Sequence, residues 1–399
     1  MSKYKGTKRT MGGALTVAVA IGVVAGALPG GVASAATTDR SASARSATTG
    51  DRAQLQAIMD RLTTVDGAPG ALLETGDRHG GSTVLTSGVA DVKSQAPVDR
   101  DSRFRIGSMT KPFVATVVLQ LVREQRVVLD APVARYLPDL MRDGEGNKDG
   151  KITVRQLLQH TSGLPDYLDL LSPAEILKDP FAHHDPRDLA NLALAAPRTF
   201  EPGKGWDYSN TDYLLVGMLI EKVTGHPYGD EIRRRIIEPL HLSQTSVPGD
   251  DPEIEGTHPR GYVRPGKDAP LLDLTEFNPS VAGASGEMIS SAGDLNHFLD
   301  ALVSGKLLYP AELRQMMTTE RTGDKGRRYG LGLESNKLPC GGRYWGHGGD
   351  IFGFQTAGGV TADGSRQATV MATVDPGGTD AQDDDMKTAI ETALCQDRR

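Results

Sequence analysis

The pair Ser108 and Lys111 has the residue types and the spacing for nucleophilic catalysis. The two residues stand one helical turn apart, just before the apolar run 113–122, so on a helix their side chains lie on one face. A serine hydroxyl becomes a strong nucleophile when a base takes its proton, and a lysine with a depressed pKa can be that base. Free N–H groups at a helix N-terminus can also stabilise an oxyanion. Ser2 and Lys5 have the same spacing, so the pattern by itself is weak evidence for catalysis. The pair alone more simply fits a helix-capping serine beside a lysine whose amine reaches solvent.

Two further short motifs follow this pair along the chain. Tyr208-Ser209-Asn210 precedes a segment, Tyr213 to Val223, whose apolar face predicts a helix, and His347-Gly348-Gly349 begins a predicted strand. Each residue also has a structural interpretation, as a core tyrosine, a helix-capping asparagine or a surface histidine. His79-Gly80-Gly81 shows that the last motif arises by chance as well. The ordered set, with each motif on a suitable element, favours a serine acyl-transfer site.

Other catalytic patterns are absent from the sequence. No serine stands in Gly-x-Ser-x-Gly, no histidines form His-Glu-x-x-His, and there is no glycine-rich phosphate loop. Asp143 to Ile152 resembles half of a calcium-binding EF-hand loop, but Gln156 replaces the bidentate glutamate, so we favour an ordinary solvated turn. We therefore expect no metal and no cofactor.

The composition and the N-terminus indicate an exported protein without nucleic-acid partners. Four basic residues precede an apolar run from Gly12 to Leu28 and the cleavage pattern Ala33-Ser34-Ala35, which predicts a secretory signal peptide over 1–35. No later stretch is long and apolar enough for a membrane span, so we expect a secreted, extracellular protein without a membrane anchor. The net charge of -7 gives no reason to expect nucleic acid as a partner. The two cysteines, Cys340 and Cys395, most simply pair in an oxidising compartment.

Both ends of the mature chain carry strand signals around a helical middle. After a flexible leader over 36–50 rich in Ser, Thr and Ala, we expect one catalytic domain over 51–399. Its α/β part covers about 51–145 and 281–399, and a mostly helical insertion covers about 146–280. Capping patterns predict helices in the insertion, and alternating or apolar runs predict the terminal strands. The predicted helices and strands include Arg52–Leu62, 108–126, Ala71–Glu74, Ser82–Val92, Tyr329–Leu333, Tyr344–Gly346, Ile351–Val360 and Arg366–Val374.

Longer segments of the chain resemble a known family. FRIGSMTK, ITVRQLLQHTSGLPDY, YSNTDYLLVGMLIEKVTGH, YGLGL and WGHGG look like the secreted serine D-alanyl-D-alanine carboxypeptidases. These are grouped with class C β-lactamases, D-aminopeptidases and β-lactamase-like esterases, all penicillin-recognising serine hydrolases. The similarity runs from about Arg52 to Cys395. It implies an α/β fold of the α+β type, in which an antiparallel sheet is flanked by N- and C-terminal helices and faces a helical domain across the active-site cleft.

The resemblance also implies roles for single residues. Ser108 would be the acylated nucleophile, and Lys111 would share its proton with Tyr208, either of which could be the general base. Asn210 would hold the amide of the acyl side, and His347 would stand where most relatives have a lysine.

The same resemblance implies an oxyanion hole and a disulfide. The backbone N–H groups of Ser108 and Asp350, next to Gly349, would form the oxyanion hole. Cys340 and Cys395 would form the disulfide of the carboxypeptidase branch.

Two departures from the carboxypeptidase pattern concern the substrate. Gly348 and Asp350 replace the threonines that bind the terminal carboxylate, and Glu334 occupies the position of an arginine. Acids beside a substrate carboxylate would repel it by about 1 kcal/mol or more per close pair. Either another cation, such as Arg343 or Lys337, compensates, or the leaving group is not an anion.

We predict hydrolysis, through a Ser108 acyl-enzyme, of a small peptide, amide or ester that contains a D-residue. Overall similarity favours a D-alanyl-D-alanine carboxypeptidase acting on cell-wall peptides, whereas the acidic substitutions favour a D-aminopeptidase, a D-amino-acid amidase or an esterase. A non-enzymatic alternative is a protein that binds penicillin or wall peptide without turnover. β-Lactams are further candidate ligands, although His347 in place of lysine argues against a true β-lactamase. We expect a monomer.

Overall fold

The computed structural model describes residues 39–141, 151–266 and 268–396. The predicted signal peptide and most of the calcium-like loop lie outside these residues and stay predictions. The described residues divide into two compact units, a first up to residue 53 and a second from residue 54 onward. Helix α1 (Asp39–Thr64) begins inside the segment 36–50, before the predicted start at Arg52. The observed helix is therefore longer than the predicted one. The flexibility of that segment stays a prediction.

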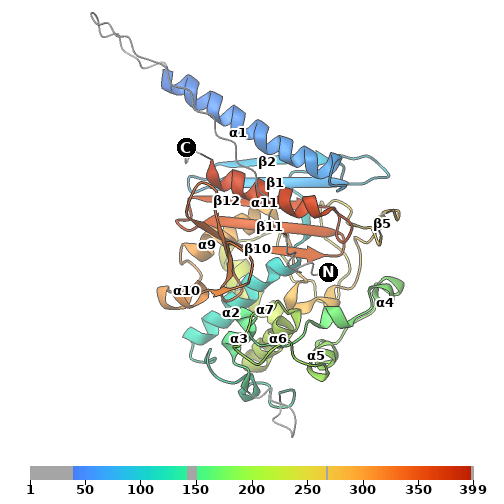
Figure 1. Ribbon diagram of the computed structural model, residues 1–399, viewed down its shortest axis with the longest axis vertical. Coiled ribbons are helices and arrows are strands. Elements are labelled where there is room, and N and C mark those ends of the chain that lie inside the picture. Colours follow the sequence, from blue (N-terminus) through green and yellow to red (C-terminus); the bar gives the residue numbers. More distant parts are fainter. Residues whose placement is uncertain (1–38, 142–150, 267, 397–399) are drawn as a thin grey trace, which may run out of the picture. The chain divides into compact units, whose positions relative to one another are not determined.

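An antiparallel sheet of eight strands organises the second unit (Figure 1). Its N-terminal hairpin joins the C-terminal strands, because Leu72 of β1 pairs with Met371 of β12. The predicted α/β architecture, with strands from both ends of the chain, is therefore confirmed. The strand order is β2 (Ser82–Gly88), β1 (Gly70–Asp77), β12 (Arg366–Ala372), β11 (Phe354–Thr361), β10 (Arg343–Ile351), β9 (Glu334–Lys337), β8 (Arg327–Tyr329) and β7 (Glu320–Arg321).

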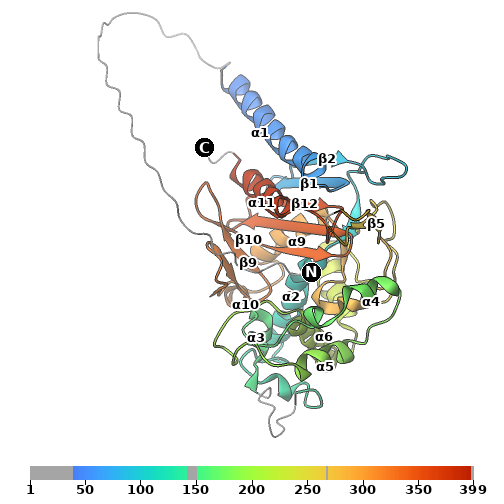
Figure 2. The same ribbon diagram turned by 45° about the vertical axis from the view of Figure 1, so that its right-hand side comes forward.

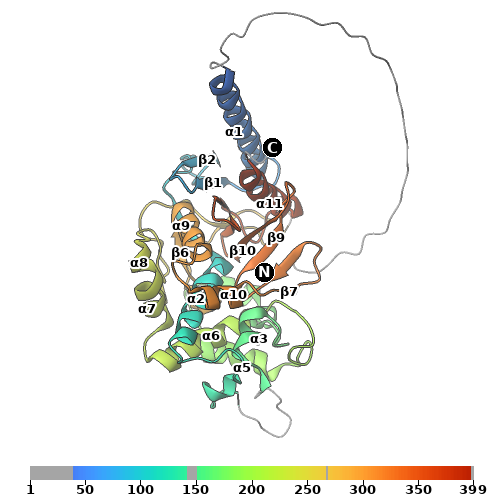
Figure 3. The same cartoon turned by 90° about the vertical axis from the view of Figure 1, so that its left-hand side faces the viewer.

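Both faces of the sheet are covered by helices because its central strands are apolar on both sides. Ala71 and Leu73 of β1 face a cluster that includes α11 (Asp380–Cys395), whereas Leu72 between them faces the larger core. Helix α9 (Ala292–Val303) packs on this second face, against β1, β11 and β12. Figures 1 and 3 show α9 and α11 on opposite sides of the sheet.

The predicted helical insertion is present, and Figure 2 shows α3, α5 and α6 gathered beyond the sheet. Thr153 and Gln156 form the capping box that the sequence predicted at the start of α3. Among the described residues, no helix is long and apolar enough to cross a membrane. The remaining helices are α2 (Thr110–Arg123), α3 (Val154–Gln159), α4 (Pro173–Lys178), α5 (Pro186–Ala195), α6 (Asn210–Thr224), α7 (Tyr228–Ile232), α8 (Glu238–Leu240) and α10 (Pro310–Met316).

Two short strand pairings lie outside the large sheet. β3 (Arg103–Arg105) pairs with β6 (Ile289–Ser291), and β4 (Tyr262–Val263) pairs with β5 (Leu272–Asp273). The strand predicted from Tyr329 to Leu333 is wrong: β8 ends at Tyr329 and β9 begins at Glu334. The chain turns between them, where Gly332 has a φ of +72°, a conformation that favours glycine. The apolar pattern was misleading because Leu331 and Leu333 are buried from within this turn.

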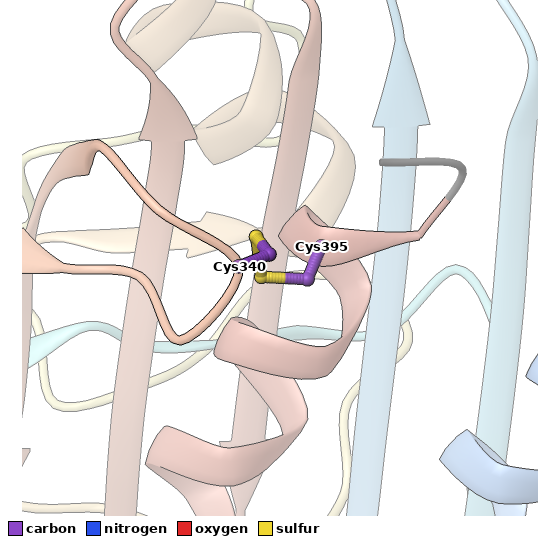
Figure 4. The surroundings of a disulfide bond; sticks show 2 residues. All are labelled: Cys340 and Cys395. Carbon is purple, nitrogen blue, oxygen red and sulfur yellow. A yellow bond between two sulfur atoms is a disulfide. The ribbon is translucent and has the colours of Figure 1, made fainter. Parts of the chain in front are cut away.

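A disulfide joins the predicted cysteines. Cys340 lies in the turn between β9 and β10, and Cys395 is the last residue of α11 (Figure 4). Their Cα atoms are 5.8 Å apart. The bond therefore attaches the C-terminal helix to the hairpin whose second strand carries His347.

Candidate active site

Ser108 lies in a tight 3-10 turn, Gly107–Met109, that leads directly into the buried helix α2. The residue before this turn is fixed to a neighbouring segment, because the Ile106 N–H donates to the carbonyl of Met288 at 2.9 Å. Pro112 and the residues around it in α2 are completely buried, whereas Ser108 is partly exposed. The apolar run predicted from the sequence thus holds a polar serine at the accessible end of a rigid helix.

Lys111 is completely buried and contacts three oxygen atoms. Its Nζ lies 2.9 Å from Ser108 Oγ, 2.7 Å from Asn210 Oδ1 and 2.8 Å from the carbonyl oxygen of Ser285. The two carbonyl-type oxygens can only accept hydrogen bonds. A neutral amine has two protons, so it donates both of them to Asn210 and Ser285 and directs its lone pair at the Ser108 hydroxyl. The geometry therefore suits a base that removes the serine proton.

The electrostatic surroundings keep this lysine close to its neutral form. Burial lowers the pKa of Lys111 to about 7, while nearby carboxylates, chiefly that of Asp166, partly oppose the change. An amine with such a pKa is partly unprotonated at neutral pH, which is the condition for general-base catalysis.

Asp166 orients the amide of Asn210 at the start of α6. Asn210 Nδ2 donates to Asp166 Oδ2 at 2.7 Å, and Asp166 Oδ1 accepts the N–H of Leu168 at 3.0 Å. This fixes the amide oxygen of Asn210 toward Lys111. Asp166 was not among the predicted site residues, although it lies in the segment ITVRQLLQHTSGLPDY that carries the family resemblance.

The aromatic rings of Tyr208 and His160 pack against each other beside Lys111. The Tyr208 ring centroid lies 4.7 Å from Lys111 Nζ and 4.3 Å from the His160 ring centroid. The structure thus brings Tyr208 to the site as predicted, next to a histidine that sequence reasoning did not select. Its catalytic role stays a prediction.

His347 is buried in strand β10, and both of its ring nitrogens have partners. Nε2 lies 2.8 Å from the hydroxyl of Tyr329, and Nδ1 lies 2.5 Å from the carbonyl oxygen of Gly348. Burial lowers the pKa of His347 to about 4, against the opposing influence of Glu334. At neutral pH this side chain is therefore uncharged, unlike the lysine that the resemblance places here in relatives.

Two glycines allow β10 to approach the serine turn. A Cβ at Gly349 would lie 2.0 Å from the carbonyl oxygen of Ile106, and a Cβ at Gly107 would lie 2.8 Å from the backbone nitrogen of Asp350. Gly107 also has a φ of +49°. This close contact brings the backbone of Asp350 next to the turn that carries Ser108. The oxyanion hole predicted from these two N–H groups is compatible with it and stays a prediction.

Glu334 is buried on β9, directly opposite Gly346 of β10. Its carboxylate lies 3.7 Å from Arg327 Nη1, and it accepts a 3.4 Å hydrogen bond from Asn336. Arg343, one of the two cations suggested to compensate for it, donates instead to the side chain and carbonyl of Ser335. Arg327 is therefore the cation that pairs with the Glu334 carboxylate.

Lys337 does not supply this charge either. It pairs with Arg343 in the ladder, three positions along the hairpin from Glu334. Arg327 itself is shared, because it also lies 2.7 Å from Asp324.

Within the described ranges, no group of three or more His, Cys, Asp or Glu side chains could hold a metal ion.

Known proteins resemble this chain over most of its length. The profile described as Beta-lactamase matches residues 55–393. Esterase EstB of Burkholderia gladioli is 30% identical over 317 residues, which cover 72% of this chain and 80% of the esterase.

Two solved structures extend the likeness. A D-stereospecific amidohydrolase from Streptomyces sp. is 38% identical with a TM-score of 0.77, covering 86% of this chain and 98% of that one. The D-amino acid amidase of Ochrobactrum anthropi SV3, complexed with L-phenylalanine amide, is 28% identical with a TM-score of 0.74, covering 86% and 97%.

Proposed function

We propose, from the premise that this chain belongs to the beta-lactamase family and is a serine hydrolase of that fold, that it cleaves amides next to a D-residue. Its leaving group would be uncharged or cationic. The carboxyl product would pass through an ester of Ser108.

The observation that carries the mechanism is the orientation of Lys111. Neutral Lys111 takes the Ser108 proton while the serine oxygen attacks the substrate carbonyl. The resulting oxyanion would be stabilised by the N–H groups of Ser108 and Asp350. The lysine proton then passes to the leaving amine, directly or through Tyr208. Water then attacks the ester carbonyl while the same base takes its proton, and this proton passes to the Ser108 oxygen as the ester bond breaks and the carboxyl product leaves.

The preference for an uncharged leaving group rests on Glu334. A carboxypeptidase needs a cation for the terminal carboxylate of its substrate, but here an acid occupies that position. Arg327, the cation beside it, already faces two carboxylates, those of Glu334 and Asp324. A substrate carboxylate would compete with both. The names of the amidohydrolase and the amidase support an amide substrate, and overall similarity keeps a D-alanyl-D-alanine carboxypeptidase as the second candidate.

A matched pair of substrates tests the proposal. An N-acetylated peptide ending in D-Ala-D-Ala is offered with a free C-terminus and with an amidated one, beside the amides of D- and L-phenylalanine. We expect cleavage of the amidated peptide or the D-amide, with little cleavage of the free acid or the L-amide. Release of D-alanine from the free acid alone would overturn the amidase proposal and establish a carboxypeptidase.

Ser108→Ala is the control for every substrate. It should fold and lose all hydrolysis, because the acyl-enzyme needs the serine oxygen. Mass spectrometry after substrate is exhausted separates enzyme from binder: a persistent mass increase on Ser108 would indicate a protein that acylates without turnover. An ester of the same D-residue tests the esterase alternative, which the likeness to the Burkholderia esterase supports.

We further propose export through the N-terminal segment, with cleavage after Ala35. N-terminal sequencing of the mature protein from culture medium tests this. A retained N-terminus would contradict it.

A further inference from the structure

A chain of four buried side chains leads from α6 to the catalytic strand. Asp212 Oδ2 lies 3.1 Å from His160 Nδ1, and His160 Nε2 lies 3.2 Å from the hydroxyl of Tyr329. The same hydroxyl lies 2.8 Å from His347 Nε2. All four residues are buried, with exposed fractions between 0% and 4%. None of these three contacts involves Ser108 or Lys111.

The direction of proton donation is fixed at the His347 end. His347 Nδ1 contacts the Gly348 carbonyl oxygen, which can only accept, so Nδ1 carries the proton. In neutral imidazole the other nitrogen is then an acceptor. Tyr329 must therefore donate its single hydroxyl proton to His347 Nε2. That leaves the Tyr329 oxygen to accept from His160, so His160 carries its proton on Nε2.

The other end of the chain gives the same answer independently. The backbone N–H of Ser209 points at His160 Nδ1 at 3.3 Å, which requires Nδ1 to be an acceptor. Asp212 Oδ2 contacts this same unprotonated nitrogen. Two acceptors at 3.1 Å are bonded only if one of them carries a proton. Because burial favours a neutral His160, the carboxyl of Asp212 carries it and shares the Nδ1 lone pair with the Ser209 N–H, while its Oδ1 accepts from Ser162 at 2.6 Å.

We infer that Asp212 is a neutral carboxylic acid, and that Asp212, His160 and Tyr329 are positioning residues whose ordered hydrogen bonds fix the tautomer and orientation of His347. The protonation states follow from hydrogen-bond geometry together with the neutral state that burial favours for both imidazoles. The catalytic consequence rests on the proposed function. His347 in turn donates to Gly348, next to the glycine that packs against the serine turn. The chain therefore holds the strand segment that carries the Asp350 N–H.

The charges around the chain agree with this assignment. Burial raises the pKa of Asp212 well above its usual range, and Asp166 and Asp207 add to this, while the hydrogen bond from Ser162 and the charge of Lys111 oppose it. Burial also lowers the pKa of His160, with Lys111, His347 and Arg327 acting in the same direction.

The His347 end has a similar balance. Glu334 favours its charged form, whereas burial, Lys111 and Arg327 favour the neutral form that the chain requires. Tyr329 remains a phenol, because burial raises its pKa further.

Spectroscopy of the intact protein tests the proton positions without reference to activity. We expect ¹⁵N NMR to show the Nδ1–H tautomer for His347 and the Nε2–H tautomer for His160 at neutral pH. Infrared difference spectra between the wild type and Asp212→Asn should contain the carbonyl stretch of a protonated carboxylic acid. An ionised Asp212, or the opposite tautomer of either histidine, would overturn the assignment even if the enzyme proves to be an amidase.

Two substitutions of Asp212 sharpen the test. Asn can donate to His160 and accept from Ser162 as a protonated Asp does, whereas Ala can do neither. We expect Asp212→Asn to keep at least a third of kcat and Asp212→Ala to lose about ten-fold or more. An ionised Asp212 would instead make the Asn variant as defective as the Ala variant.

The pH dependence of stability gives a second readout. A folded-state pKa above the usual 3.8 means that the folded protein keeps a proton that the unfolded chain has lost. The unfolding free energy of the wild type should therefore fall as the pH rises from about 4 to neutrality, relative to Asp212→Asn. Equal pH profiles for the two proteins would contradict the proposal.

Tyr329→Phe removes the two hydrogen bonds of the Tyr329 hydroxyl, one with His160 and one with His347. We expect kcat to fall about ten-fold or more with a smaller change in KM, and the His347 ¹⁵N signals to show a mixture of tautomers. Tyr262→Phe is the matched control, because Tyr262 is also buried but its hydroxyl contacts the Val92 N–H and Asp91, outside the site. If both variants lose activity equally with an unchanged His347 spectrum, the role of Tyr329 is structural and the inference fails.

Discussion

The carboxylate of Asp166 lies 2.7 Å from the amide nitrogen of Asn210, and this contact decides which end of the amide faces Lys111. With the amide oxygen toward the lysine, a neutral amine is left with its lone pair on Ser108. An acid that contacts neither Ser108 nor Lys111 directly thus orients the proposed base through Asn210.

Asp166→Ala should impair catalysis by freeing the Asn210 amide to rotate. We expect kcat/KM to fall about 100-fold, since small misplacements of catalytic groups have effects of that size. Steady-state kinetics on the D-amide checks this, with circular dichroism as a folding control. Asp169→Ala, an exposed acid three residues away, should keep wild-type rates. Equal kinetics for the two variants would refute the orienting role.

The pH dependence of the rate should report Lys111. The amine acts as a base only when unprotonated, and its pKa is about 7. We therefore expect kcat/KM to rise about ten-fold per pH unit below 7 and to level off above it. A full pH–rate profile measures this. A plateau that continues well below pH 6 would show that Lys111 is not the base.

Gly349→Ala should disrupt the contact between β10 and the serine turn. The new Cβ would lie 2.0 Å from the backbone oxygen of Ile106, so the strand must shift. We expect a loss of about 100-fold to 1,000-fold in kcat, as for the loss of one oxyanion donor. Gly348→Ala, whose Cβ would have only an ordinary 3.8 Å contact, should change kcat less than ten-fold. The reverse order of effects would argue against an oxyanion site here.

Removing the disulfide should destabilise the protein without abolishing the chemistry. The bond closes a loop between residues separated by 55 positions, which corresponds to about 4 kcal/mol on the chain-entropy model. The double variant Cys340→Ser/Cys395→Ser should lose about this much unfolding free energy in denaturant titrations. Its kcat at low temperature should stay near wild type. An unchanged denaturation midpoint would show that the bond contributes little.

The sequence by itself indicated the Ser108–Lys111 pair and the fold class. Ser108, Lys111 and the apolar run after them interact through local helical spacing, which is readable along the chain. The strands at both ends and the helices between them follow from periodicity and caps. The cysteine pair follows from the count of two cysteines in a chain with a predicted signal peptide.

Only the tertiary structure decided how these residues are oriented and charged. The contacts of Asp166 with Asn210, and of Tyr329 with His160 and His347, join segments far apart in the chain. Such contacts depend on how helices pack on strands, and no local spacing encodes them. The neutral state of His347 likewise needs its burial to be known, because desolvation sets the pKa. Arg327, and not Arg343, reaches Glu334 because the chain turns after Tyr329, where the sequence predicted a continuous strand.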